Sequence, residues 1–162
     1  MTQARSETPE SSEVREEGVA IARLDGEGHR VEVDMPGGHT VISDHPPQFG
    51  GHDGGPQPID LMVASLAACK AMTIRAQAER HGWPVTGAVV TGRHERVSAR
   101  KLGEGKRGIV DLIDCEIEIH GDELTEEQRQ RLYELSASCW VQHALETQTR
   151  ITSRLTERRG TD

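Results

Sequence analysis

Two of the three cysteines in this chain lie in settings that suit thiol chemistry. Cys69 ends an apolar run in which Ser65 is the one polar residue after Leu61. Cys139 follows Ser138, which could cap a short helix and place Cys139 in the first turn, where free N–H groups stabilise a thiolate. Because burial in mid-helix raises the pKa of a thiol, local physics favours Cys139 as the more reactive of the two.

The third cysteine has a different pattern around it. Residues 113–120 alternate between apolar and polar side chains, with Cys115 in the apolar set. This alternation is typical of a strand with one packed face, so we expect Cys115 to face the packed side of a sheet. We interpret it as a small core side chain rather than a reactive thiol.

Cys69 lies within a long helix that we expect over residues 58–81. Pro58 suits a first helical turn, and Gly82 followed by Pro84 is a stop signal. Because the first half of this segment has almost no polar face, we expect it to be buried on all sides. It also carries small side chains that would let a second backbone approach, which predicts a homodimer built on this helix: Ala64, Ala67, Ala68 and Ala71.

The other elements follow from short β-type runs and turn clusters. Residues 19–24, 29–35 and 39–43 predict a three-stranded antiparallel meander, in which 29–35 has one wet and one dry face. Residues 85–97 predict a strand that pairs with the 113–120 run, and Thr125 is a candidate N-cap of a second helix. Residues 147–155 predict a final strand.

The Gly/Pro-rich loop over 44–57 precedes the long helix. It lacks the glycine spacing and the Lys of phosphate-binding loops, so we expect no phosphate site there. His45, His52, Asp44 and Asp53 match no metal-ligand spacing, and we interpret them as solvated loop residues. The sequence therefore predicts neither a metal nor a bound cofactor.

Size and charge bound the function further. The chain has 162 residues and a net charge of −8, with acidic and basic residues interspersed, so we expect one domain and no nucleic-acid partner. Residues 1–17 predict a disordered tail, 18–156 the domain and 157–162 a charged C-terminal tail. No apolar run is long enough to span a membrane and no signal peptide is apparent, so we expect a cytoplasmic protein with reduced thiols.

From about Val19 to Leu155 the chain resembles the OsmC/organic hydroperoxide resistance family of thiol peroxidases. The segments 55–61 and 67–73, with Cys69, resemble the start of the family's central helix, and 79–84 resembles its end. Cys139-Trp-Val resembles the family's Cys-Pro-Val. The resemblance implies an α+β fold, in which antiparallel sheets wrap around the long central helix of each chain and two chains intertwine as a homodimer.

The resemblance also implies an activity. In this family the first cysteine, at Cys69 here, attacks a hydroperoxide and becomes a sulfenic acid, which the second, at Cys139 here, resolves to a disulfide. An external dithiol, and no cofactor, would complete the cycle. Hydroperoxide-specific members carry a Glu after the helix-opening proline to orient an arginine; here Ile59 takes that position, Asp60 follows, and Arg23 or Arg30 is the candidate arginine.

Three hypotheses therefore compete. The first is a thiol-dependent peroxidase that reduces organic or other hydroperoxides in oxidative-stress defence. The second, favoured by the Ile59 departure, is a protein of the same fold that binds a small apolar or thiol-reactive ligand and has weak or no peroxidase activity. In the third, both cysteines merely pack in the core.

Overall fold

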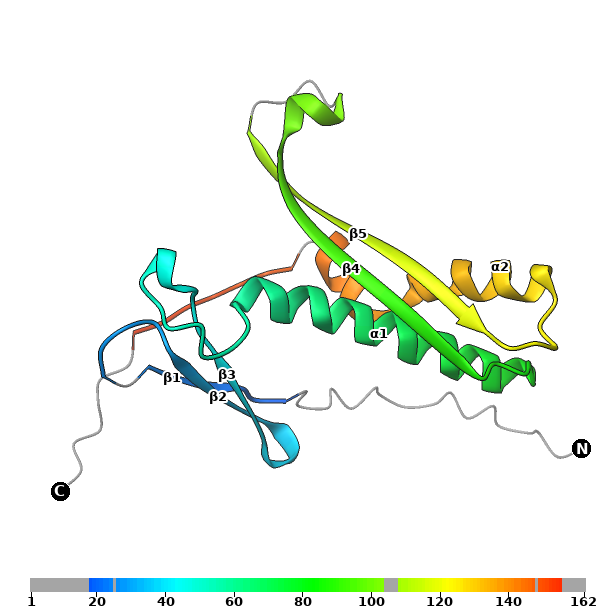
Figure 1. Cartoon of the computed structure of the whole chain (residues 1–162), viewed down its shortest axis with the longest axis horizontal. Helices are drawn as coiled ribbons and strands as arrows, with labels where there is room; N and C mark the ends of the chain where they lie inside the picture. The colour runs from blue at the N-terminus through cyan, green and yellow to red at the C-terminus, as the bar shows by residue number, and fades with distance from the viewer. Residues whose placement is uncertain (1–17, 25, 104–107, 148, 156–162) are drawn as a thin grey trace, which may run out of the picture. The chain divides into compact units, whose positions relative to one another are not determined.

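The computed structural model describes residues 18–24, 26–103, 108–147 and 149–155. They divide into two compact units, one before and one after the boundary between Pro58 and Ile59 (Figure 1). The predicted tails over 1–17 and 157–162 lie outside the described residues, and a single domain over 18–156 stays a prediction. Within the described part, no helix is both long and apolar enough to cross a membrane.

The N-terminal unit is built on a small antiparallel sheet. Its strands are β1 (Ile21–Leu24), β2 (Val31–Met35) and β3 (His39–Ser43), in the order β1-β2-β3. A 3₁₀ turn, η1 (Pro36–Gly38), joins β2 to β3. The predicted meander is therefore confirmed.

The predicted alternation in β2 holds only in its first half. Val31 and Val33 are half-buried, whereas Met35, expected on the dry face, is exposed. Met35 is the last residue of the strand, where the chain enters η1. Asp34, expected on the wet face, is half-buried because its carboxylate accepts hydrogen bonds from Arg23 and Thr40.

The loop after β3 folds around the carboxylate of Asp44. Asp44 is 2% exposed, and it accepts hydrogen bonds from the backbone N–H groups of His45 at 2.7 Å, His52 at 3.0 Å and Gly54 at 3.1 Å. The interpretation of Asp44 as a solvated loop residue is therefore wrong. A short polar side chain that satisfies three backbone donors organises a turn more strongly than solvation would.

Two glycines of this loop are needed for close backbone approach. A Cβ atom at Gly51 would lie 1.8 Å from the carbonyl oxygen of His45, and one at Gly55 would lie 2.3 Å from that of Ile42. No side chain fits at such distances. The glycine-rich composition thus lets the loop, with its 3₁₀ turn η2 (Pro47–Phe49), close on itself.

The loop should lose order in acid. Burial alone would raise the pKa of Asp44, but the N–H groups of Gly54, His52 and His45 outweigh it and lower the pKa below the ordinary 3.8. A carboxylate with a depressed folded pKa stabilises the fold above its unfolded pKa, and this contribution is lost as the pH falls through the folded value. NMR titration of the His52 and Gly54 amides should give a midpoint below 3.8. Asp44→Asn should abolish that transition, and a midpoint at or above 3.8 would contradict the assignment.

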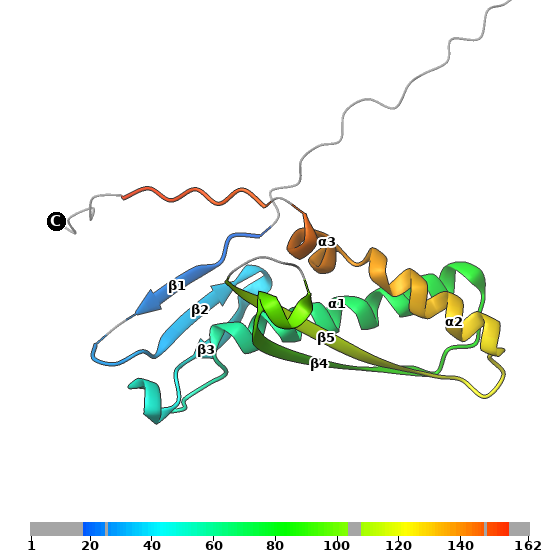
Figure 2. The ribbon, with the colours of Figure 1, turned by 90° about the horizontal axis from the view of Figure 1, so that it is seen from above.

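The C-terminal unit is built on α1 (Pro58–His81). The hairpin of β4 (Gly87–Ser98) and β5 (Ile109–His120) lies along one side of α1, while α2 (Glu126–Leu135) and α3 (Trp140–Glu146) lie along another (Figure 2). Two 3₁₀ turns, η3 (Ala99–Leu102) and η4 (Ser136–Ser138), complete the unit. Its buried core joins the helices to the hairpin and consists of Ile74, Ala78, Val85, Leu124 and Leu132.

The bounds of α1 match the predicted 58–81, but its burial does not match. Gly82 follows the helix with a φ of +66°, and the N–H of Trp83 donates to the carbonyl of Ala78 at 2.9 Å. Within one chain the helix buries a single stripe at a spacing of four residues: Leu66, Lys70, Ile74 and Ala78. All-round burial of the first half is wrong for the single chain, because the hairpin and the C-terminal helices leave one face uncovered.

Of the predictions for β5, α2 and the C-terminal segment, the first two are confirmed and the last is wrong. The apolar set of β5 is half-buried and its polar set exposed, as expected, and Cys115 pairs with Gly92 of β4. Thr125 caps α2 in a capping box with Gln128. Residues 149–155 form no strand, so that prediction is wrong: an extended segment becomes a strand only by pairing, and no described residue pairs with it.

Candidate active site

The structure brings Cys69 and Cys139 together. Cys69 lies in the middle of α1 and is half-buried, whereas Cys139 immediately precedes α3 and is 1% exposed. The two side chains are close enough for Cys69 to raise the pKa of the Cys139 thiol, and both thiols are free. Because both residues belong to the C-terminal unit, the packing of α3 against α1 positions the pair.

Local backbone geometry explains the position of Cys139. Cys139 has an extended backbone, with φ −68° and ψ 139°, and its Sγ accepts a hydrogen bond from the N–H of Gln142 at 3.3 Å. Cys139 is therefore itself the N-cap of α3. The expected cap, Ser138, instead donates its hydroxyl to the carbonyl of Leu135 at 2.7 Å, so that prediction is wrong by one residue.

Burial reverses the expected reactivity of Cys139. Burial is the largest effect and raises its pKa; the Gln142 N–H opposes this, Cys69 adds to it, and the charge of Lys70 lowers the pKa again. The net effect is a raised pKa of the Cys139 thiol. The depressed pKa expected from the start of a helix is therefore wrong, because desolvation of the thiolate outweighs one N–H donor.

Sequence reasoning missed Lys70, which interrupts the buried stripe of α1. Lys70 is 8% exposed, and its ammonium donates to the side-chain Oε1 of Gln142. One signal could have found it: Lys70 lies four residues from Leu66 and four from Ile74, on the stripe that a helix of this length buries. A lysine there brings a positive charge beside Cys139.

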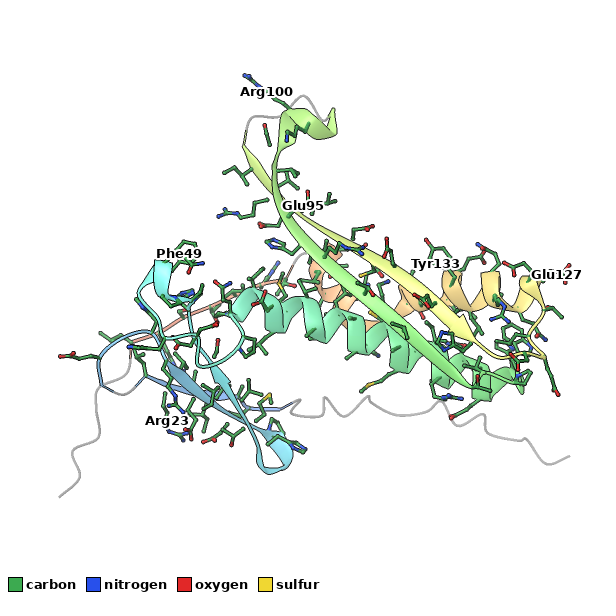
Figure 3. All side chains as sticks on the ribbon, viewed as in Figure 1. Arg23, Phe49, Glu95, Arg100, Glu127 and Tyr133 are labelled. Carbon is green, nitrogen blue, oxygen red and sulfur yellow. The ribbon has the colours of Figure 1, made fainter. Side chains whose placement is uncertain are left out.

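The predicted supporting arginines lie in the other unit. Arg23 projects from β1 and pairs with Asp34, whose pKa it lowers (Figure 3). Arg30 is exposed just before β2. Since both belong to the N-terminal unit and both cysteines to the C-terminal unit, contact between an arginine and Cys69 stays a prediction.

Asp60 lies in the first turn of α1 and is exposed. It lines a cavity of about 360 Å³ between α1 and β4, together with Val63, Ala64, Ala67, Gly92 and His94. Gly92 allows this close approach, because a Cβ atom there would lie 2.7 Å from a methyl group of Val63. The cavity is large enough for a small ligand near the start of the central helix.

A second cavity, of about 430 Å³, is lined in part by Lys70 and Gln142. Cys115 lines it, as does Tyr133 of α2, whose side chain is labelled in Figure 3. Cys115 is half-buried on β5, which confirms that it faces the packed side of the hairpin. Among the residues that the structure describes, no group of three or more His, Cys, Asp or Glu side chains could hold a metal ion.

Residues 51–154 match the model of a protein family described as OsmC-like protein. The matched segment runs from the glycine-rich loop through α1 to Arg154 and contains all three cysteines. A comparison with curated proteins finds no match.

Solved structures with the same fold have names related to this family. The organic hydroperoxide resistance protein OsmC of Legionella pneumophila has a TM-score of 0.61 and 20% identity, covering 83% of this chain and 92% of that one. An OsmC-like protein of unknown function from Vibrio cholerae has a TM-score of 0.64 and 14% identity, covering 81% of this chain and 94% of that one. The organic hydroperoxide resistance protein OhrB of Bacillus subtilis has a TM-score of 0.56 and 16% identity, covering 80% of this chain and 90% of that one. At these identities the likeness establishes the α+β fold.

Proposed function

The chain belongs to the OsmC-like family, and we propose that it is a thiol-dependent peroxidase that reduces organic or other hydroperoxides through a Cys69/Cys139 dithiol-disulfide cycle. The observation that carries the proposal is the proximity of two thiols that are far apart in sequence, close enough for Cys69 to raise the pKa of Cys139. The third cysteine, Cys115, lies on β5. Relatives in fold that are named for organic hydroperoxide resistance support the same reaction class.

The cycle follows from ordinary thiol chemistry. The Cys69 thiolate attacks the terminal peroxide oxygen, the O–O bond breaks, and the alkoxide leaves and takes a proton to become an alcohol. The Cys69 sulfenic acid is then attacked at sulfur by the Cys139 thiolate, which breaks the S–O bond and releases hydroxide. An external dithiol reduces the resulting disulfide by exchange, so the two electrons that reduce the peroxide come from that dithiol.

The raised pKa of Cys139 fits the role of resolving thiol. A nucleophile that meets the peroxide must be a thiolate beforehand, whereas a resolving thiol is needed only after the sulfenic acid has formed. Cys69 is also the more exposed of the two, which lets a substrate reach it. In this proposal Arg23 or Arg30 supplies the cation that activates Cys69, with Asp60 in support.

The alternative is a small-ligand-binding protein with weak or no peroxidase activity. Ile59 at the position of the family's Glu favours it, as does the cavity of about 360 Å³ beside Asp60. An assay that measures the loss of peroxide separates the two functions. Cumene hydroperoxide, tert-butyl hydroperoxide and hydrogen peroxide are each tested with dithiothreitol or dihydrolipoamide as the reductant. The peroxidase consumes at least one of these peroxides catalytically, whereas a binding protein leaves all of them at the level of the reductant alone.

We expect the protein to form a homodimer through the uncovered face of α1. Ala64 and Ala68 are exposed on this face, and Met72 is 72% exposed, which is unusual for a large apolar side chain on a central helix. Sedimentation velocity at micromolar concentration should show a dimer. Ala68→Arg should shift it toward the monomer, whereas Glu127→Arg on the exposed face of α2 should not. A monomeric parent protein would contradict the prediction.

A further inference from the structure

Lys70 carries a buried ammonium, and the roles proposed for the two cysteines do not explain why a charged side chain is buried there. A lysine is almost never fully buried unless its charge is paired or hydrogen-bonded. Lys70 is 8% exposed, and its ammonium donates to the neutral Oε1 of Gln142. The side chains of Asp111 and Asp114 on β5 and of Glu146 on α3 line the same cavity. A neutral amide compensates the loss of water around an ammonium less well than a carboxylate does. The arrangement becomes more favourable when a negative charge forms nearby.

Gln142 connects Lys70 to the resolving thiol. Its backbone N–H donates to Cys139 Sγ at 3.3 Å, its Oε1 accepts from Lys70, and its Nε2 donates to Glu146 at 2.9 Å. Three contacts hold this residue in the first turn of α3. The N–H aimed at the Cys139 sulfur is therefore fixed partly from α1, through the lysine that follows Cys69 in sequence.

We propose that Lys70 is a positioning residue for the second chemical step, in which its ammonium stabilises the Cys139 thiolate and its hydrogen bond holds Gln142 against the Cys139 sulfur. The inference rests on the proposed Cys69/Cys139 cycle. In that step the Cys139 thiol loses its proton to solvent, its thiolate attacks Cys69 sulfur, and the S–O bond breaks to release hydroxide. The charge of Lys70 favours the only form of Cys139 that can attack.

The position of Lys70 makes its effect selective. Its side chain lies on the buried stripe of α1, and its charge acts on Cys139 across the contact between α1 and α3. Loss of this charge should therefore slow disulfide formation and leave the reaction of Cys69 with peroxide close to the parental rate. A sulfenic acid on Cys69 would then persist.

The first test needs no peroxide. In a Cys69→Ser/Cys115→Ser background, Cys139 is the one remaining thiol, and its ionisation can be followed by thiolate absorbance. Lys70→Met should lower the thiolate fraction near neutral pH by about tenfold. Lys70→Gln, which keeps a hydrogen-bonding group but not the charge, should do the same, whereas the exposed Lys101→Met should have no effect. An unchanged Cys139 titration in both Lys70 variants overturns the proposal, whether or not the protein is a peroxidase.

The second test follows a single turnover with all three cysteines present. After one equivalent of cumene hydroperoxide, Lys70→Met should form the Cys69 sulfenic acid at the parental rate and close the disulfide about tenfold more slowly. The defect should become smaller at alkaline pH, where Cys139 ionises without help and only the hydrogen bond to Gln142 is missing. A defect of equal size at every pH indicates a structural effect and contradicts the proposal. Failure of the parent protein to consume peroxide would instead count against the proposed function.

Discussion

Replacement of Cys69 with serine should reduce hydroperoxide consumption by about a thousandfold or more, to the level of the reductant alone. The reason is chemical: the attacking atom is lost, and a serine hydroxyl does not take up the oxygen that a thiolate takes up. Consumption is measured as the disappearance of cumene hydroperoxide under an excess of dithiothreitol. Cys115→Ser is the matched control and should keep the parental turnover, because Cys115 is a half-buried residue of β5 that takes no part in the proposed dithiol cycle.

Cys139→Ser should give a different defect. Without a resolving thiol, Cys69 should react once and stop as a sulfenic acid, which dimedone traps on the peptide that contains Cys69. If Cys69→Ser instead keeps one turnover and carries the dimedone adduct on Cys139, the two roles are reversed.

The second large effect concerns the core that holds α1, α2 and the hairpin together. Leu132 is fully buried and belongs to the cluster with Ile74 and Ala78. Leu132→Ala should lower the free energy of unfolding by about 2 to 5 kcal/mol, because it removes buried methyl groups and leaves a cavity. Urea denaturation monitored by circular dichroism measures the loss at a fixed protein concentration.

Leu145→Ala provides the control for this stability measurement. Leu145 is 44% exposed on α3, so the same change in side chain should cost less than about 1 kcal/mol. Equal losses for the two variants would mean that α2 does not pack as described. A loss below about 1 kcal/mol at Leu132 would mean the same.

Local signals made the long helix and the hairpin predictable. Pro58 and Gly82 act within one turn of the helix ends, so the bounds of α1 follow from neighbouring residues alone. The alternation around Cys115 likewise depends on the two faces of one strand. In each case the physical cause lies within a few residues of its effect, so a sequence pattern is sufficient.

The site could be predicted only in part, because its properties depend on contacts between distant segments. Cys139 looked activated at the start of a helix, but the packing of α3 on α1 buries it, and desolvation decides its pKa. Lys70 directly follows Cys69 in the sequence, and only the packing of α1 shows that it lies on the buried stripe. Asp44 looked solvated, and its three backbone partners come from residues up to ten positions later. These effects depend on contacts between distant segments, so they can be assessed only once the fold is known.

Peptide mapping of the oxidised protein shows directly which cysteines form a disulfide. The reduced wild-type protein is treated with one equivalent of cumene hydroperoxide, its remaining thiols are alkylated, and it is digested without reductant. We expect one disulfide-linked peptide pair that joins Cys69 to Cys139, with Cys115 recovered in its alkylated form. Recovery of Cys69 and Cys139 both alkylated, or a disulfide through Cys115, would contradict the proposed dithiol cycle.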